Sequence, residues 1–81
     1  MQKNACVALG NRREESAVPA LSAALTSNES LVRGHAAWAL GQIANPEAIK
    51  ALEQSYEDET DQYVRSELTA ALDIVARKKH L

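Results

Sequence analysis

The chain repeats itself at an interval of 31 to 32 residues, and this period limits what it can fold into. The pair Val32-Arg33 recurs as Val64-Arg65, each time ahead of a ladder of alanine and leucine. A shift of 31 residues also aligns seven identical residues: Ala5, Ala8, Leu9, Gly10, Ala17, Ala20 and Leu21 fall on Ala36, Ala39, Leu40, Gly41, Ala48, Ala51 and Leu52. Such periods are typical of stacked repeat proteins, in which each unit buries its apolar face only against a neighbour.

The period divides the 81 residues into two full units and a half unit. The first covers about residues 1–28, the second 29–59 and the half repeat 60–81. Together they form one domain. Because Met1 aligns with Val32, inside a unit, we expect the chain to be a fragment of a larger protein.

Hydrophobic periodicity predicts five helices and no strand. The expected ranges are 2–11, a second helix ending near 25, a third from 29 or 30 to 44, a fourth from 46 to about 56, and a fifth from 60 or 61 to 78. Gly10-Asn11 is expected to end the first helix. Asn45-Pro46 should start the fourth, because asparagine caps helices and proline suits their first turn.

Composition narrows the function classes. The net charge of −2 argues against a general electrostatic trap for nucleic acid. Locally, Glu57, Asp58, Glu59 and Asp61 form an acidic segment between helices, and Arg77, Lys78, Lys79 and His80 form a basic end that suits a helix C-terminus.

A single cysteine, Cys6, excludes an internal disulfide and a multi-cysteine metal site within the chain. It aligns with Ala37 and should behave as a small hydrophobe. The sequence has no signal peptide, transmembrane run or lipidation motif, so we expect a cytoplasmic protein without a membrane partner.

Two faces can be distinguished on the expected third helix. At about 100° per residue, one arc holds the predicted core residues Val32, Ala36, Ala39, Leu40 and Ile43. A second stripe holds Leu31, His35, Trp38 and Gln42, with Trp38 roughly 140° from the centre of the core arc. The core therefore does not need this tryptophan.

Stacking the units would merge this stripe with its counterparts on the first and fifth helices. The merged surface would contain Asn4, His35, Trp38, Gln42, Tyr63 and Glu67. Tryptophan and tyrosine offer large contact areas and stack on bases, so this surface is a candidate recognition patch. Alternatively, Trp38 fills the groove between adjacent helices by packing on Val7 and Ala70, and the two roles are compatible.

Three further residues in the repeats need an explanation. Arg33 and Arg65 follow helix starts, where the dipole does not favour a cation. We expect them to pair with loop carboxylates, such as Glu29 and Asp61, or with carbonyls of an adjacent unit; contact with phosphate is the alternative. Gly34 inside a helix costs about 1 kcal/mol relative to alanine, which suggests a close approach by a neighbouring backbone or ligand.

The pattern "VRxxAAxALGxI", followed by "NPEAI" and "xAL", resembles HEAT-like repeats of the short bacterial kind. The resemblance covers essentially the whole chain. It implies an all-α fold: a right-handed α-α superhelix, or solenoid, of about two and a half helix pairs. Such repeats serve as scaffolds in unrelated proteins, so the fold alone does not assign a function.

The segments "QKNACVALGN", "VPAL" and "LVRGHAAWALGQI" are similar to the C-terminal HEAT-like tail of the bacterial epoxyqueuosine reductase family. In that family a cobalamin-dependent, iron–sulfur reductase completes queuosine synthesis on the wobble position of tRNA, and the tail helps hold the anticodon arm. This chain has neither the cofactor domain nor the ferredoxin-like cysteine runs. The resemblance therefore implies no cofactor in this chain, with cobalamin and 4Fe-4S clusters only in parent domains.

The expected function is a non-catalytic module that holds a macromolecular partner. No Ser, Cys or second His stands at helical spacing from His35 to complete a nucleophilic or metal site. The resemblance implies tRNA as the partner, and it fits the surface derived above, because Asn4, His35 and Trp38, with Arg33 at the rim, are residue types suited to an RNA loop with unstacked bases. A protein-binding scaffold is the alternative, and no small-molecule substrate is expected.

Overall fold

The computed structural model describes residues 1–79 and consists of helices joined by short loops. The five α-helices are α1 (Lys3–Arg12), α2 (Val18–Ala24), α3 (Ser30–Ile43), α4 (Pro46–Asp58) and α5 (Gln62–Lys79). A 3-10 turn, η1 (Glu15–Ala17), precedes α2 and was not expected from the sequence. Residues 1–79 contain no strand. The predicted all-α fold of five helices is confirmed.

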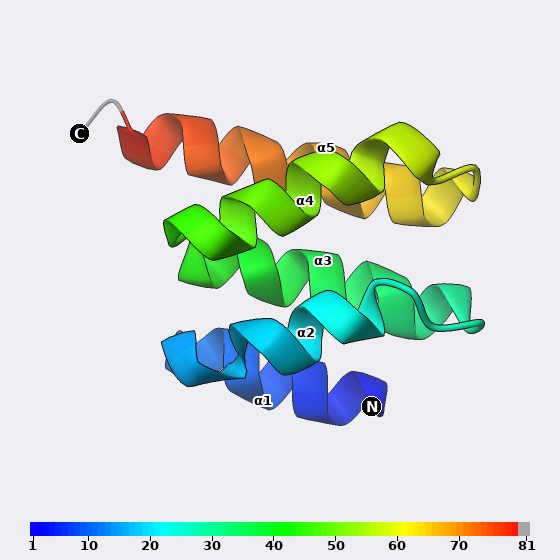
Figure 1. Ribbon diagram of the computed structural model, residues 1–81, viewed down its shortest axis with the longest axis horizontal. Coiled ribbons are helices and arrows are strands. Elements are labelled where there is room, and N and C mark those ends of the chain that lie inside the picture. The colour runs from blue at the N-terminus through cyan, green and yellow to red at the C-terminus, as the bar shows by residue number, and fades with distance from the viewer. Residues whose placement is uncertain (80–81) are drawn as a thin grey trace.

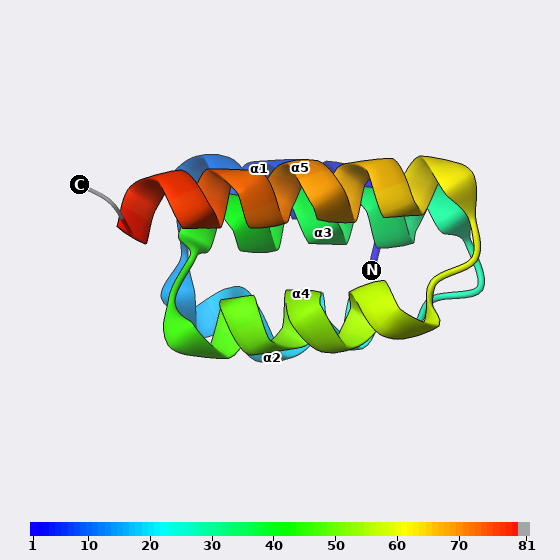
Figure 2. The same ribbon diagram turned by 90° about the horizontal axis from the view of Figure 1, so that it is seen from above.

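The helices form two layers. One layer contains α1, α3 and α5 side by side, and the other contains α2 and α4 (Figure 1; Figure 2). Because each loop crosses between layers, helices that follow one another in sequence lie in opposite layers. The helix α3 occupies the middle of its layer and contacts all four other helices.

The core lies between the layers and is built from aliphatic residues at helical spacing. Every helix contributes, and the largest completely buried side chains are Leu21, Leu40, Leu52, Leu68, Val64 and Cys6. Among the predicted core residues of α3, Val32, Ala36, Ala39 and Leu40 are buried and Ile43 packs against them. Their burial stabilises the fold by roughly 1.5–3 kcal/mol for each large aliphatic side chain.

The capping predictions are largely confirmed. The Oδ1 atom of Asn45 accepts a hydrogen bond from the backbone N–H of Ala48 at 2.8 Å, and Pro46 is the first residue of α4. At the start of α5, Oδ1 of Asp61 accepts from the N–H of Val64 at 3.1 Å. Of the two positions at which the fifth helix was expected to start, Thr60 and Asp61, Asp61 therefore provides the cap.

The first helix ends one residue later than the predicted end at Asn11. Gly10 and Asn11 lie inside α1, which continues to Arg12 and ends with Arg13 in the left-handed region at φ 50°. Gly10 is buried because α3 packs directly against it. The glycine is thus a packing residue, and a signal that usually marks a helix end serves a tertiary contact here.

Because α3 lies in the middle of its layer, more of its residues are buried than the sequence predicted. Besides the expected arc, Gly34, Ala37 and Gly41 are also buried, because α1 and α5 flank the helix on both sides. In contrast, Ala5 and Ala8, the counterparts of Ala36 and Ala39, are exposed on α1. The same repeat position is thus core or surface according to whether a neighbour covers it.

Candidate partner-binding surface

His35 on α3 and Tyr63 on α5 form the one direct polar contact that the structure gives among the predicted site residues in its described part. The Tyr63 hydroxyl lies 3.4 Å from Nδ1 of His35. The Tyr63 ring rests on Gly34, where an added Cβ would lie 2.4 Å from the ring atom Cε2. A close approach is therefore found at Gly34, but the Tyr63 side chain makes it and not the backbone or ligand that the sequence suggested.

The hydrogen bonds of His35 fix which ring nitrogen carries a proton. Nδ1 lies 2.8 Å from the carbonyl oxygen of Leu31, which can only accept, so Nδ1 donates. In the neutral ring Nε2 is then the acceptor. Since Tyr63 also keeps an O–H donor, the pair presents a hydrogen-bond donor beside an acceptor.

The acidic neighbours of Tyr63 affect its hydroxyl. Burial raises the pKa of Tyr63 above its ordinary value of 10.0, and the charges of Glu67 and Asp61 raise it further. The hydroxyl therefore stays protonated at neutral pH and remains able to donate.

Trp38 lies between α3 and α1. An added Cβ on Gly10 would be 2.5 Å from Cζ3 of the indole, so the ring covers this glycine, and it packs against the core while remaining partly exposed. Of the packing partners predicted for it, Val7 is half-buried and Ala70 is exposed. The contact with Gly10 was not predicted, because only Val7 and Ala70 were considered as packing partners of Trp38.

The remaining predicted residues lie on the same layer. Asn4 is exposed near the start of α1 and lines a shallow groove that Leu31 also lines. Glu67 is half-buried on α5, and Gln42 is half-buried near the end of α3. The backbone carbonyl of Gln42 accepts a hydrogen bond from Nζ of Lys78 at 2.8 Å.

That lysine belongs to the predicted basic end. Lys78 satisfies a C-terminal carbonyl of α3, a neighbouring helix, instead of one in its own helix, where the prediction placed the effect. Arg77 forms an exposed ion pair with Asp73 at 2.9 Å. His80 lies outside the described residues.

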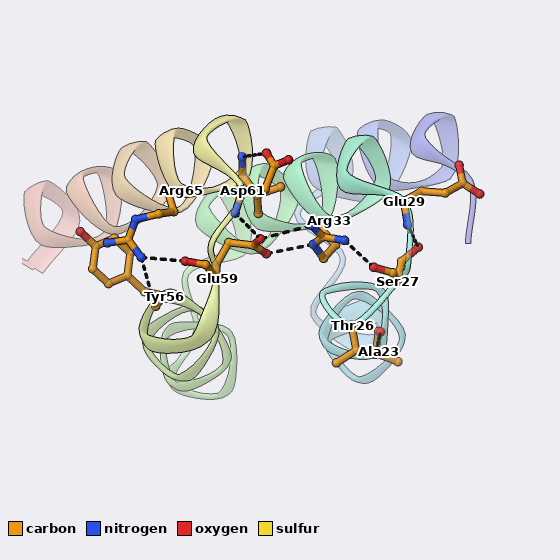
Figure 3. Close-up of polar contacts among 10 residues, drawn as sticks. Ala23, Thr26, Ser27, Glu29, Arg33, Tyr56, Glu59, Asp61 and Arg65 are labelled. Carbon is orange, nitrogen blue, oxygen red and sulfur yellow. Dashed lines mark hydrogen bonds and ion pairs between the residues drawn. The ribbon is translucent and has the colours of Figure 1, made fainter.

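Arg33 is held on the loop side of the layer, where it joins two repeat units (Figure 3). Its Nε donates to Oε1 of Glu59 at 2.9 Å, and Nη2 donates to Oε2 at 3.2 Å. Nη1 donates to the carbonyl of Ser27 at 2.8 Å. The predicted type of partner, a loop carboxylate, is correct, but the residue is Glu59 and not Glu29.

Arg65 occupies the equivalent position and uses a different set of partners. Its Nη1 donates to the carbonyls of Glu59 at 2.8 Å and Tyr56 at 3.1 Å, and its guanidinium lies 4.4 Å from the centre of the Tyr56 ring. Both arginines thus bond the carbonyl six residues earlier, Ser27 or Glu59. Asp61, the carboxylate predicted for Arg65, caps α5 instead, and the predicted alternative, pairing with carbonyls of the adjacent unit, is confirmed.

Glu59 is the residue that the sequence analysis missed. Its side chain is 8% exposed and accepts a hydrogen bond from the N–H of Asp61 at 3.0 Å as well as those from Arg33. Burial raises the pKa of Glu59, but the Arg33 and Asp61 hydrogen bonds outweigh it and lower the pKa below its ordinary value of 4.5. The available signal was the place of Glu59 in the acidic segment between the fourth and fifth helices.

The two layers differ in charge. The exposed side of α4 carries four carboxylates, Glu47, Glu53, Glu57 and Asp58, against one Lys50. On the other layer, the exposed cations Lys3 and Arg12 of α1 and Arg77 and Lys78 of α5 stand against exposed Asp73 and half-buried Glu67. An anionic partner would therefore approach the layer that holds His35 and Tyr63.

The described residues contain no group of three His, Cys, Asp or Glu side chains that could hold a metal ion. Cys6 is buried and its Sγ lies 3.4 Å from Sδ of Met1, and burial raises the pKa of its thiol. In the described part of the chain, no helix combines the length and the apolar character needed to cross a membrane.

Comparison with known proteins gives a match to the family model of HEAT repeats over residues 1–73. An epoxyqueuosine reductase of Bacillus cereus is 38% identical over 80 residues, which cover 98% of this chain and 21% of that protein. A deoxyhypusine hydroxylase of Mus musculus is 43% identical over 68 residues, covering 82% of this chain and 22% of that protein.

A crystal structure of a selenomethionine-labelled epoxyqueuosine reductase has the same fold. It matches with a TM-score of 0.84 and 32% identity, over 91% of this chain and 20% of that one. The chain thus resembles a small part of epoxyqueuosine reductase and spans about a fifth of the length of these relatives.

Proposed function

Because the chain belongs to the HEAT-repeat family, whose stacked helices offer extended binding surfaces, we propose that it is a non-catalytic module that holds a macromolecular partner. We further propose that this module positions the tRNA substrate of an epoxyqueuosine reductase. The observation that carries the proposal is coverage: 98% of the chain aligns with 21% of the Bacillus cereus reductase. Coverage of this kind is expected when a chain corresponds to one module of a larger enzyme.

The chemistry of the α1-α3-α5 layer supports RNA as the partner. Sequence-specific RNA recognition relies on unpaired bases, whose edges form hydrogen bonds and whose faces stack on aromatic rings. The donor of Tyr63 and the acceptor Nε2 of His35 offer hydrogen bonds side by side. Tyr63, which is 40% exposed, and the partly exposed Trp38 offer ring surface.

The charge distribution limits how tightly the module can bind by itself. Affinity for nucleic acid depends strongly on neutralised phosphates, and the chain carries a net charge of −2. Arg33, which was predicted at the rim of the surface, is already bound to Glu59 and Ser27. We therefore expect the isolated chain to bind tRNA weakly, so that its role is to orient a tRNA held mainly by other parts of the enzyme.

We expect this chain to hold no cofactor of the reductase family. An iron–sulfur cluster is held by several cysteine thiolates, and this chain has a single, buried Cys6. We propose that 4Fe-4S clusters and cobalamin are bound by other domains of the parent enzyme. The part played by this chain is then independent of the redox chemistry.

A protein-binding scaffold is the second candidate, and the acidic exposed side of α4 favours it. Its four carboxylates would repel RNA but would suit a basic protein surface. The similarity to a deoxyhypusine hydroxylase is a further reason, because the same repeat occurs in a protein with a differently named activity. The two candidates use opposite layers, so substitutions can separate them.

A chimera of the Bacillus cereus reductase would test the proposal. The segment that aligns with this chain is replaced by the chain itself, and the reductase is assayed with tRNA under steady-state conditions. Replacing both His35 with Ala and Tyr63 with Phe should then raise KM for tRNA by roughly tenfold, a loss of about 1.4 kcal/mol. The value of kcat should change little, because the substitutions remove binding and not chemistry.

The matched control is Glu53→Gln, on the exposed side of α4. It should leave KM unchanged. If the double substitution had no effect on KM while Glu53→Gln weakened binding to a basic protein, the scaffold would replace RNA positioning as the function.

A further inference from the structure

The three helices of the α1-α3-α5 layer meet through one repeated contact. Where α3 packs on α1, an added Cβ on Gly10 would lie 2.9 Å from Cα of Ala39. Where α5 packs on α3, an added Cβ on Gly41 would lie 2.9 Å from Cα of Ala71. Each junction thus places an alanine of the later helix against a glycine of the earlier one, at equivalent repeat positions.

The outward edge of α5 lacks the glycines on which such a contact depends. The residue equivalent to Gly41 is Asp73, whose side chain is 58% exposed and paired with Arg77. The residue equivalent to Gly34 is Ser66, whose hydroxyl donates to the carbonyl of Gln62 at 3.0 Å. A charged side chain and a satisfied polar one therefore replace both glycines, so another helix could not approach this edge as closely as α5 approaches α3.

The outward edge of α1, in contrast, has alanine at the position that meets a glycine in the two junctions. Ala8 is equivalent to Ala39 and Ala71, which each meet a glycine, but Ala8 itself is exposed. Ala5 is exposed as well, although its counterparts Ala36 and Leu68 are completely buried. The edge thus has the same small, apolar residues that form the interior junctions.

We propose that the stack can be extended at one edge only. The α1 edge docks a further helix pair of the HEAT class, and the α5 edge terminates the stack. The docked helix carries a glycine opposite Ala8, because the two junctions within the chain have this form. The α5 edge acts as a cap, since the terminal units of repeat proteins need a polar outer face for solubility.

A second copy of this chain does not fit as the occupant. In a head-to-tail pair, Ala8 of one molecule would face Asp73 of the other, and the contact would bury a charge that now lies in water. Head-to-tail filaments are therefore disfavoured, and the proposed occupant is a helix pair with glycine at the facing position.

Two extended chains, built from the chain's own repeats, would test whether only the α1 edge accepts a further helix pair. In the first, a copy of residues 30–63 precedes Met1, so that the copied Gly41 faces Ala8. In the second, residues 1–75 are followed by a copy of residues 44–79, so that the copied Ala71 faces Asp73. The first extension should raise the melting temperature by roughly 5 °C or more in one cooperative transition. The second should give no increase.

Matched variants make each result specific. Ala8→Asp should abolish the gain in the first extended chain, yet leave the melting temperature of the original chain nearly unchanged because Ala8 is exposed there. Asp73→Gly should allow the second extension to raise the melting temperature. Equal gains from both extensions, or a first gain insensitive to Ala8→Asp, would overturn the proposal.

Sedimentation of the original chain provides an independent check. We expect a monomer. A dimer that Ala8→Asp dissociates would contradict the proposal, because it would show that a second copy, and not a glycine-bearing helix pair, covers the α1 edge.

Discussion

The two flanks of α3 are built on the same backbone contact but are fastened differently. Towards α1, the contact consists of Gly10 beneath Trp38 and Ala39. Towards α5, Gly41 lies against Ala71, and the Arg33–Glu59 ion pair adds a link from the loop before α5. In the part of the chain that the structure describes, no ion pair joins α1 to α3. Close packing is therefore the shared requirement, and the polar link is an addition to one junction.

The largest effect should come from filling the glycine positions. Gly41→Ala would place a Cβ 2.7 Å from Cβ and 2.9 Å from Cα of Ala71, and the backbone atom cannot turn aside. We expect a loss of about 2 kcal/mol in the free energy of unfolding, after the roughly 1 kcal/mol that alanine gains over glycine in a helix. Urea denaturation measures it.

Gly10→Ala is the matched test on the α1 flank. If backbone contact is the shared requirement, its cost should be similar, because the added Cβ would lie 2.9 Å from Cα of Ala39. A cost at Gly10 that vanishes in a Trp38→Ala background would show that this flank depends on the indole alone.

Removing the charge of Glu59 should have the next largest effect and should act on the α5 flank alone. Glu59→Gln weakens two hydrogen bonds from Arg33, and we expect a loss of about 1–2 kcal/mol. Hydrogen exchange should show faster opening of α5 than before, with the exchange of α1 unchanged. Equal acceleration in α1 would mean that the two junctions are not independent.

The same residue predicts a dependence of stability on pH. Since the pKa of Glu59 is lower in the folded chain than its ordinary 4.5, its stabilisation is complete above that value. The contribution is lost as the pH falls through the lowered pKa, when Glu59 becomes protonated. Unfolding measured between about pH 6 and 3 should show a shallower decline for Glu59→Gln than for the natural chain. Parallel declines would exclude this role for the carboxylate.

The smallest effect is expected at Gly34. The three atoms nearest to an added Cβ there all belong to the Tyr63 side chain, and Tyr63 is 40% exposed, so its ring can rotate away. Gly34→Ala should therefore change the free energy of unfolding by less than about 1 kcal/mol, since helix propensity offsets the disturbance. It should, however, separate Tyr63 from His35, which a changed NMR shift of the His35 ring protons would report.

Much of this fold could be predicted from the repeat. Val32, Ala36 and Leu40 have helical spacing and are buried, and Asn45 and Asp61 cap the helices that follow them. The end of α1 was predicted to within one residue, but the contact of Gly10 with α3 could not be predicted, because only the tertiary structure brings the two helices together. For the candidate site, helical spacing placed His35 and Tyr63 on corresponding stripes of the third and fifth helices, but it did not predict that the two side chains touch.

The sequence by itself determined the number and type of helices and most of the residues that they bury, because helical periodicity and capping are local properties. The tertiary structure decided which of two equivalent repeat positions is buried and which is exposed. Ala8 and Ala39 have the same residue type and repeat position, but only Ala39 has a neighbouring helix over it. It likewise chose Glu59 over Glu29 as the partner of Arg33, because a loop distant in sequence lies next to α3 only after the layers have formed.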